Sequence, residues 1–382
     1  MINQDFTRQL SNTAWEAGKS RSLSQFLRID PPLLFSLLLL GGFGLLVLYS
    51  ATGRNVAEVQ RQAMALGVAV VFMITVAQFN IYFYRRWAPT LYTAGLALLG
   101  LVLFMGVEAN GARSWLDLPG LPSFQPSEIM KFVVPMLVAW YLGSRPLPPR
   151  FKHLFWAAVM ILVPAGMIVV QNDTGTAIMV TMSGIFVILL AGVRWRLVFA
   201  GLFAAMLASP AWYIFLAQDH QKNRILTFFD PYRDPTGAGY NIIQSQIAIG
   251  SGGIYGKGWG NGAQSQLDFI PESNTDFILA VLAEEFGLLG VLFLTVLYLL
   301  VLARGFYIAY NATDMFSRLL AGSITLTFFF YVFVNMAMVS GLLPVIGLPL
   351  PLISRGGTSL LTLFIGFGLL MSIQARERRW PR

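Results

Sequence analysis

The sequence has no cysteine and only two histidines, and these absences exclude several kinds of site. Without cysteine there is no disulfide, no thiolate metal centre and no cysteine nucleophile, although the redox compartment stays open. The two histidines, His153 and His220, are too few for a histidine-rich metal site. They also give a Ser-His-Asp triad little support.

Charge is scarce as well. Only 12% of the 382 residues are charged and 56% are hydrophobic, whereas soluble domains are about one quarter charged. This composition indicates an integral membrane protein. The polar segment before Leu33 lacks an apolar core with a small-residue cleavage site, so no removable signal peptide is expected. We predict one membrane domain over residues 33–374, with tails at 1–32 and 375–382.

Ten segments are long and apolar enough to cross a bilayer as helices, which takes about 20 residues. They are 33–53, 60–80, 87–106, 127–143, 153–171, 175–193, 196–216, 276–303, 317–341 and 357–374. Their continuous apolarity favours helices over the alternating strands of a barrel. The predicted fold class is therefore all-α, a polytopic membrane protein with about ten transmembrane helices.

Basic residues are distributed unevenly between these spans. If the N-terminus is cytoplasmic, 17 of the 26 lysines and arginines lie on the cytoplasmic side. They are four in the tail 1–32, four in the tail 375–382, and Arg85, Arg86, Arg145, Arg150, Lys152, Arg194, Arg196, Arg304 and Arg318. The positive-inside rule then predicts that both termini are cytoplasmic. Topology explains the net charge of +8, so no nucleic-acid partner is expected.

The long segment 217–275 is extracytoplasmic in this topology. A loop of this length is usually functional or disordered, and its composition favours order. Residues 242–250 (IIQSQIAIG) suit a helix, and the flanking stretches mix aromatic residues with glycine and proline. We predict a large ordered cap on the outer membrane surface.

The glycine-rich stretch GSGGIYGKG at 250–258 lies within this cap. A P-loop needs glycine where this chain has Ser251, and serine or threonine where it has Gly258. Two interpretations remain. The stretch is either a tight turn or a place where backbone amides and Lys257 contact a ligand phosphate.

Charged side chains within apolar spans are costly, so each needs a partner or a function. Glu128 and Lys131 in PSEIMKF share a helix face and form either a structural ion pair or part of a substrate cleft. Asp276 opens the eighth span and is either a helix cap or a reactive group. Glu284 and Glu285 are predicted to lie about 12–13 Å deeper. There they would be interior charges that pair with Lys131, an arginine or backbone of another helix.

Two more features stand at the outer ends of spans. Asp173, in QNDTGTA, is explained by turn chemistry alone. The segment GLPLPLISRGGTS at 347–359 is a proline-rich approach to the last span. Non-helical backbone of this kind is tolerated at membrane depth only where protein or a cavity surrounds it. Arg355 within it is expected to be an outward cation.

Taken together, five segments resemble the SEDS family (shape, elongation, division and sporulation), most closely its cell-elongation branch. They are QPSEIMK at 125–131, QNDTGTA at 171–177, DPTGAGYNIIQSQIAIGSGGIYGKG at 234–258, FIPESNTDFILAVLAEE at 269–285 and GLPLPLISRGGTS at 347–359. The resemblance covers nearly the whole chain. It implies a ten-helix peptidoglycan glycosyltransferase of the cytoplasmic membrane that polymerises lipid II on the outer face. It also implies a class B penicillin-binding protein as the transpeptidase partner.

The resemblance also implies roles for individual residues. The family's catalytic aspartate falls on Asp276, which would act as general base on the acceptor sugar's hydroxyl group. Glu128, Lys131 and Asp173 fall on positions that are functionally important in the family. A divalent cation, Mg²⁺ or Mn²⁺, is implied without identified ligands, and no organic cofactor is expected.

Basic side chains are the other candidates for neutralising the pyrophosphate leaving group. By position they are Arg224, Lys257 and Arg355. The family often has tyrosine where this chain has Arg355, so an anion-binding role there is inferred from its charge alone.

Two other functions remain open. Ten helices with interior charges and a broken segment also suit a transporter or lipid II flippase, although the sequence has no clear internal repeat. A non-enzymatic scaffold for wall synthesis is the third hypothesis, and it predicts that Asp276 is dispensable.

Overall fold

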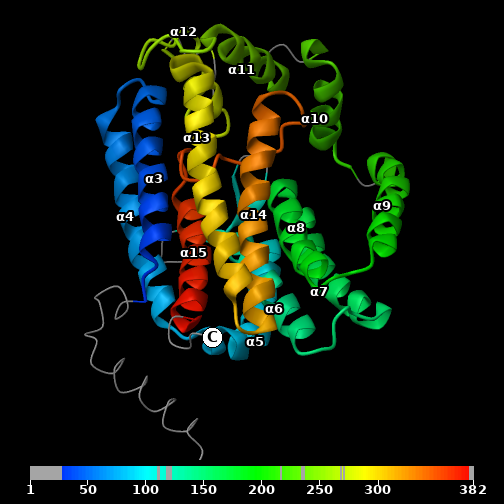
Figure 1. The fold of residues 1–382 in the computed structure, drawn as a ribbon. Helices are drawn as coiled ribbons and strands as arrows, with labels where there is room; N and C mark the ends of the chain where they lie inside the picture. The colour runs from blue at the N-terminus through cyan, green and yellow to red at the C-terminus, as the bar shows by residue number, and fades with distance from the viewer. Residues whose placement is uncertain are drawn as a thin grey trace, which may run out of the picture.

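The structure is a computed structural model that describes residues 28–109, 112–117, 123–215, 217–233, 237–266, 269 and 272–377. Long helices stand side by side in a bundle, and short helices cover one end of it as a cap (Figure 1). The bundle helices are α3 (Pro31–Ala51), α4 (Val56–Gln78), α5 (Ile81–Met105), α6 (Pro126–Gly143), α7 (Phe151–Val170), α8 (Thr174–Leu190), α9 (Trp195–Phe215), α13 (Ile278–Asn311), α14 (Met315–Val339) and α15 (Gly357–Glu377).

Eight of these helices are long and apolar enough to cross a membrane. The other two are α8, an apolar helix of 17 residues, and α6, whose 18 residues include Glu128 and Lys131. The prediction of an all-α polytopic membrane protein with about ten spans is therefore confirmed for the described part of the chain. A short antiparallel hairpin, β1 (Val107–Ala109) and β2 (Ala112–Trp115), follows α5 and was not expected.

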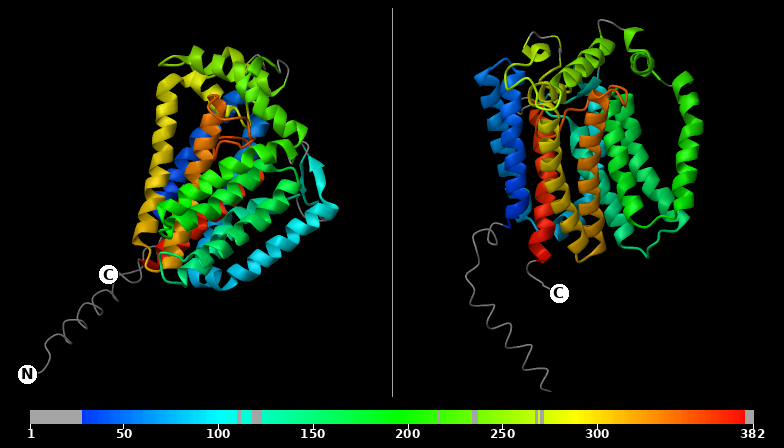
Figure 2. Two further views of the ribbon diagram at one scale, coloured as in Figure 1. Left: turned by 90° about the vertical axis from the view of Figure 1, so that its right-hand side faces the viewer. Right: turned by 45° about the horizontal axis from the view of Figure 1, so that its top comes forward.

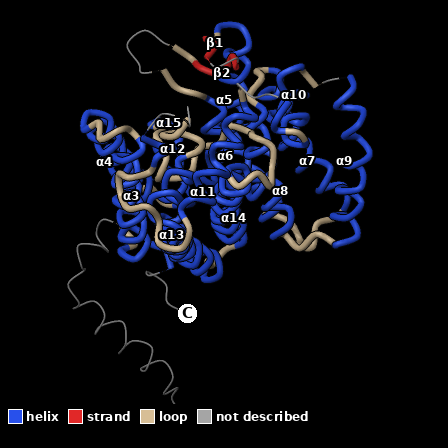
Figure 3. The backbone as a smooth tube through the Cα atoms, turned by 90° about the horizontal axis from the view of Figure 1, so that it is seen from above, coloured by secondary structure: helices blue, strands red, loops and turns tan. Residues whose placement is uncertain are grey.

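Burial differs strongly between the helices. In α14, 72% of the most apolar window is buried, whereas no described residue of α9 is buried. Helix α9 stands apart from the other helices in Figure 1, in the right-hand view of Figure 2 and in Figure 3. Its length and hydropathy suit lipid contact along most of its surface.

Polar side chains begin several of the helices by accepting hydrogen bonds from their first free amides. These N-caps are Asp30 of α3, Asn55 of α4, Asn80 of α5, Asp173 of α8 and Asp314 of α14. Asp30 also forms a salt bridge of 2.7 Å with Arg304 of α13. The start of α3 and the end of α15 lie at the end of the bundle opposite the cap (Figure 1).

The cap consists of α10 (Asp219–Phe229), the 3₁₀ turn η1 (Pro231–Arg233), α11 (Ala238–Gly252) and α12 (Ala263–Gln266). The helix expected at 242–250 lies within α11. The segment 217–275 is thus folded over its described residues, as predicted. Residues 234–236, 267–268 and 270–271 of that segment lie outside the described residues, as do 1–27 and 378–382 of the predicted tails.

Helix α13 breaks at Gly287, which has φ 65° and ψ −162°. A break removes intrahelical hydrogen bonds, and buried backbone groups need replacements. The glycine-rich stretch supplies them. The amides of Lys257 and Gly258 donate to the carbonyls of residues 284 and 285, and the amides of residues 288 and 289 donate to the carbonyls of residues 253 and 254.

This docking explains why the stretch 250–258 needs glycine. Gly256 has φ 78°, and a Cβ atom there would lie 2.1 Å from the carbonyl oxygen of Glu285. Gly287 is equally close to the facing loop, since its Cβ would lie 2.3 Å from the amide nitrogen of Gly256. Of the two earlier interpretations, the geometry matches the turn, with the added finding that the turn is docked on α13.

The contacts of Glu284 and Glu285 correct their expected depth. The chain changes direction directly after them, beneath the cap (Figure 2). Glu284 receives a hydrogen bond from the amide of Gln264 in α12 and pairs with Lys257 in the cap. These contacts place Glu284 beside the cap and not deep in the span, where the sequence predicted it.

Candidate active site

Asp276 lies in the turn 272–277 that leads into α13. The N-cap of α13 is Phe277, so Asp276 does not cap this helix. Its carboxylate is partly buried and receives no hydrogen bond from the residues that the structure describes. Burial and the neighbouring charge of Glu272 together raise the pKa of Asp276 to about 6, and the charge of Arg224 opposes them. An unbonded carboxylate with this pKa has the properties of a general base at neutral pH.

Arg224 reaches this turn from the cap. Its Nη1 donates to the carbonyl of Ile346 at 3.1 Å. Gly347 follows directly, and a Cβ atom there would lie 3.6 Å from Oδ2 of Asp276. The structure therefore brings Arg224 of α10, the start of the proline-rich segment and Asp276 to one place.

The start of α10 is tied to the turn that precedes α8. Gln218 donates to the side chain of Asn172 at 2.6 Å, and Gln221 donates to the hydroxyl of Thr174 at 2.7 Å. Asp173, between them, accepts from the amide of Thr176 at 3.0 Å and caps α8. It also accepts from Nε2 of Gln125 at 2.5 Å. Burial raises the pKa of Asp173.

Glu128 and Lys131 form a buried ion pair of 2.6 Å within α6. The hydroxyl of Thr362 in α15 donates to the second carboxylate oxygen of Glu128 at 3.0 Å. Lys131 Nζ lies 5.0 Å from the ring centroid of Tyr331 in α14. The charges of Lys131, Glu128, Asp173 and Asp276 all act on Tyr331. The buried ion pair, Asp173 and Asp276 therefore all lie within electrostatic range of one tyrosine.

Two of the predicted cations are engaged elsewhere. Lys257 forms a salt bridge of 2.7 Å with Glu284, and Arg355 forms one of 3.2 Å with Glu58 of α4. Of the partners expected for Glu284, Lys131 is wrong because it pairs with Glu128, whereas backbone of another helix is confirmed by the amide of Gln264 in α12. Glu285 accepts a hydrogen bond of 2.5 Å from Ser50 at the end of α3.

An apolar groove of about 490 Å³ runs along α7 and α8. Its lining residues are Leu162, Ala165, Gly166, Val169, Thr174, Ala177, Ile178, Thr181 and Met182. Thr174 is adjacent to Asp173, so one end of the groove lies beside this carboxylate. An apolar groove that ends at ionisable groups suits an amphipathic molecule.

Several residues of this region were not singled out in the sequence. Gln125, Tyr331 and Asn335 contact the predicted residues from α6 and α14. The available signal was a polar residue in an otherwise apolar span, and Asn335 is the only carboxamide of α14.

The fold and the site define a multi-pass membrane protein whose candidate site residues lie towards the capped end of the described helix bundle, next to an apolar groove. The chain belongs to the FtsW/RodA/SpoVE family, whose model, described as cell cycle protein, matches residues 32–379. The resemblance to the SEDS family is thereby confirmed.

Individual relatives cover nearly all of the chain. The peptidoglycan glycosyltransferase MrdB of Escherichia coli K12 is 46% identical over 350 residues, which is 92% of this chain and 94% of MrdB. The rod shape determining protein RodA of Thermus thermophilus matches with a TM-score of 0.69 at 31% identity, covering 91% of this chain and 97% of RodA. A chain from a peptidoglycan synthase complex, solved to explain how polymerization and crosslinking are coordinated, matches with a TM-score of 0.80 at 33% identity. That match covers 92% of this chain and 98% of the other.

Proposed function

We propose that this chain is a peptidoglycan glycosyltransferase that polymerises lipid II at the outer face of the cytoplasmic (inner) membrane during cell elongation and shape maintenance. The names of the relatives support this activity. The structural observation that carries it is the partly buried carboxylate of Asp276, which has a pKa of about 6 and lies in electrostatic reach of Arg224.

Asp276 acts as the general base in this reaction. Its carboxylate takes the proton of the acceptor's 4-hydroxyl as that oxygen attacks the anomeric carbon of the donor. The bond from this carbon to the pyrophosphate oxygen breaks, and its electron pair leaves with undecaprenyl pyrophosphate. A base with a pKa of about 6 is mostly ionised at neutral pH and still accepts a proton well.

Arg224 is our candidate for neutralising the charge of the leaving group. Of the three predicted cations, only Arg224 has no carboxylate within salt-bridge distance in the described part of the chain. Its guanidinium contacts a single backbone carbonyl, so further donors are available for phosphate oxygens.

A divalent cation remains a proposal. The described residues contain no group of three or more metal-ligating side chains. Magnesium, however, is commonly held by one or two carboxylates together with water and substrate phosphate. Glu272, an exposed carboxylate in the turn that carries Asp276, would suit such an ion together with substrate phosphate. It would supply charge neutralisation at the pyrophosphate. No organic cofactor is proposed.

The groove on α7 and α8 is the proposed seat of the lipid tail, since it is apolar and ends beside Asp173. Substrate then enters from the membrane lipids, and the cap lies on the extracytoplasmic side with both termini in the cytoplasm. The basic residues of the short loops support this orientation. A class B penicillin-binding protein supplies crosslinking, in keeping with the matching peptidoglycan synthase complex that coordinates polymerization and crosslinking.

The test is polymerisation of fluorescent lipid II by the purified chain with its transpeptidase partner. We expect glycan strands from wild type and a near-complete loss with Asp276→Asn at equal expression and equal partner binding. Near wild-type rates for that variant would refute the general-base assignment. Transfer of labelled lipid II across liposomes by the inactive variant would instead favour the flippase.

A further inference from the structure

Asn335 of α14 is fully buried, and its side-chain amide donates hydrogen bonds to two backbone carbonyls. Its Nδ2 donates to the carbonyl of Asp276 at 2.9 Å and to that of Leu348 at 2.6 Å. Its Oδ1 has no hydrogen-bond partner among the described residues. One carboxamide therefore ties the turn that carries Asp276 to the start of the proline-rich segment.

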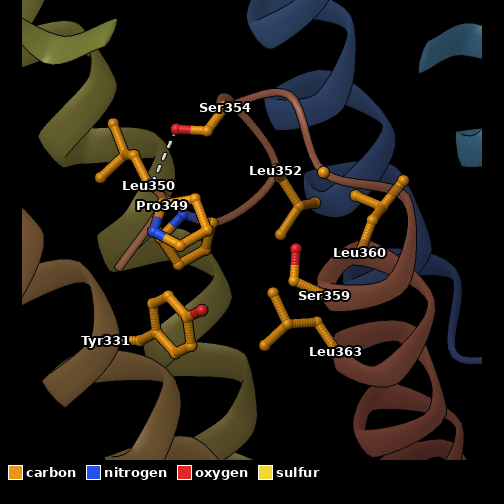
Figure 4. Close-up of a pocket in the computed structure, with 10 residues that line it drawn as sticks. Tyr331, Pro349, Leu350, Leu352, Ser354, Ser359, Leu360 and Leu363 are labelled. Carbon is orange, nitrogen blue, oxygen red and sulfur yellow. Dashed lines mark hydrogen bonds between the residues drawn. The ribbon is translucent and has the colours of Figure 1, made fainter. Parts of the chain in front are cut away.

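Ser354 holds the same turn from the other end of that segment. Its hydroxyl donates to the carbonyl of Thr275 at 2.5 Å and accepts from the amide of Leu350 at 2.7 Å, the contact marked in Figure 4. The next amide, that of Arg355, donates to the carbonyl of Asn274 at 2.9 Å. Three successive carbonyls of the turn, at residues 274, 275 and 276, are thus each bound.

These contacts matter because the carboxylate of Asp276 has no hydrogen bond of its own within the described residues. Its direction is then set by the backbone that carries it. Reactive groups lose rate steeply when they are displaced, by about 10²-fold for roughly 1 Å. Supporting hydrogen bonds are the usual means of preventing such displacement.

We propose that Asn335 and Ser354 are positioning residues for Asp276, acting through the backbone of residues 274–276 and not through substrate. This inference rests on the proposed glycosyltransferase function. Both side chains are buried, with exposed fractions of 0% for Asn335 and 4% for Ser354, so neither is open to a substrate.

Asn335 and Ser354 together form a clamp on the backbone of residues 274–276. The space beside Ser354 is small. Tyr331, Pro349, Ser354 and Ser359 border a cavity of about 10 Å³, which is about the room that one water occupies. Figure 4 shows these side chains between α14, α15 and the proline-rich segment. Ser354→Ala deletes a single oxygen atom, so it changes the packing less than a substitution of Asn335 does.

The experiment compares Asn335→Leu and Ser354→Ala with wild type in the lipid II polymerisation assay. Leucine is close to asparagine in size and has no donor. The control is Ser323→Ala, which removes a buried hydrogen bond of 2.6 Å from α14 to the carbonyl of Ser183 but does not contact the turn. We expect kcat to fall about 10- to 100-fold in the two clamp variants with little change in KM, and no such fall in the control.

The pH profile separates positioning from general destabilisation. The charged or titratable groups that act on Asp276 are Glu272 in its own turn, Arg224 of α10 and Tyr331 of α14, and the variants keep all three. A loosened turn admits water to the carboxylate, so the acid limb of the activity moves to lower pH. A loss of folded protein alone lowers activity at every pH and leaves the midpoint in place.

Hydrogen exchange gives a readout that needs no activity. Amides of residues 272–277 should exchange faster in both clamp variants than in wild type and in Ser323→Ala. If wild type polymerises lipid II but both variants keep its kcat, pH midpoint and exchange rates, the positioning role is refuted. If wild type itself makes no glycan, the proposed function fails, and accelerated exchange still reports on the clamp.

Discussion

The ionisation of Asp276 sets a strong expectation for how the rate depends on pH. With a pKa of about 6, roughly one tenth of the carboxylate is ionised at about pH 5 and roughly nine tenths at about pH 7. A general base works only when ionised, so kcat/KM should drop about tenfold over this interval. A carboxyl group at its ordinary value of 3.8 would stay more than about nine tenths ionised throughout, and the rate would hardly change.

Glu272→Gln tests the cause of the shift. The variant removes a negative charge that raises the pKa of Asp276, so the acid limb should move to lower pH and activity at about pH 5 should rise relative to about pH 7. The matched control is Glu108→Gln, an exposed carboxylate in β1. Initial rates of lipid II polymerisation at constant ionic strength provide the measurement. An unchanged midpoint, or equal rates at about pH 5 and pH 7 for wild type, would contradict the reasoning.

Three further predictions concern stability and charge. Lys131→Met should destabilise the protein by about 3–5 kcal/mol, because it leaves the buried charge of Glu128 without its partner. The double variant Lys131→Met with Glu128→Gln should be less destabilised, and thermal melts in detergent measure the difference. Gly256→Ala should cost about 1–3 kcal/mol more than Gly253→Ala in the same melts. Both have positive φ, but only at Gly256 would the added Cβ meet backbone. Arg224→Met should lower kcat roughly 10²-fold with normal stability, and an effect on KM alone would contradict its role at the leaving group.

The spans were predictable because the bilayer imposes length and apolarity on each helix separately. Helix α8 illustrates the limit of that reasoning, since it has 17 residues although 19 were expected at 175–193. It ends at Leu190, shortly before Gly192 with φ 80°, and hydropathy does not show such an end. The hairpin after α5 was missed because its strands have only three and four residues, too few for an alternating pattern.

Asp276 was recognisable in the sequence because the resemblance places the family's catalytic aspartate there, whereas its position alone suits a helix cap as well. Its neighbours were not, since they come from distant segments. The pairing of Lys257 with Glu284 depends on the break at Gly287, and the sequence around Gly287 reads as one continuous helix. A glycine within a long apolar run is compatible with an unbroken helix, so the break became visible only with the backbone conformation.

The break and the clamp have a common physical origin. Backbone groups that leave a helix inside a membrane protein must find new partners, because lipid offers none. At Gly287 the partners are amides and carbonyls of the cap loop, and in the turn 274–276 they include Asn335 and Ser354. The short helical segment between these two places is therefore held at both ends by other parts of the chain. That arrangement lets the carboxylate of Asp276 remain unbonded, since its surroundings supply the rigidity that its own hydrogen bonds would otherwise provide.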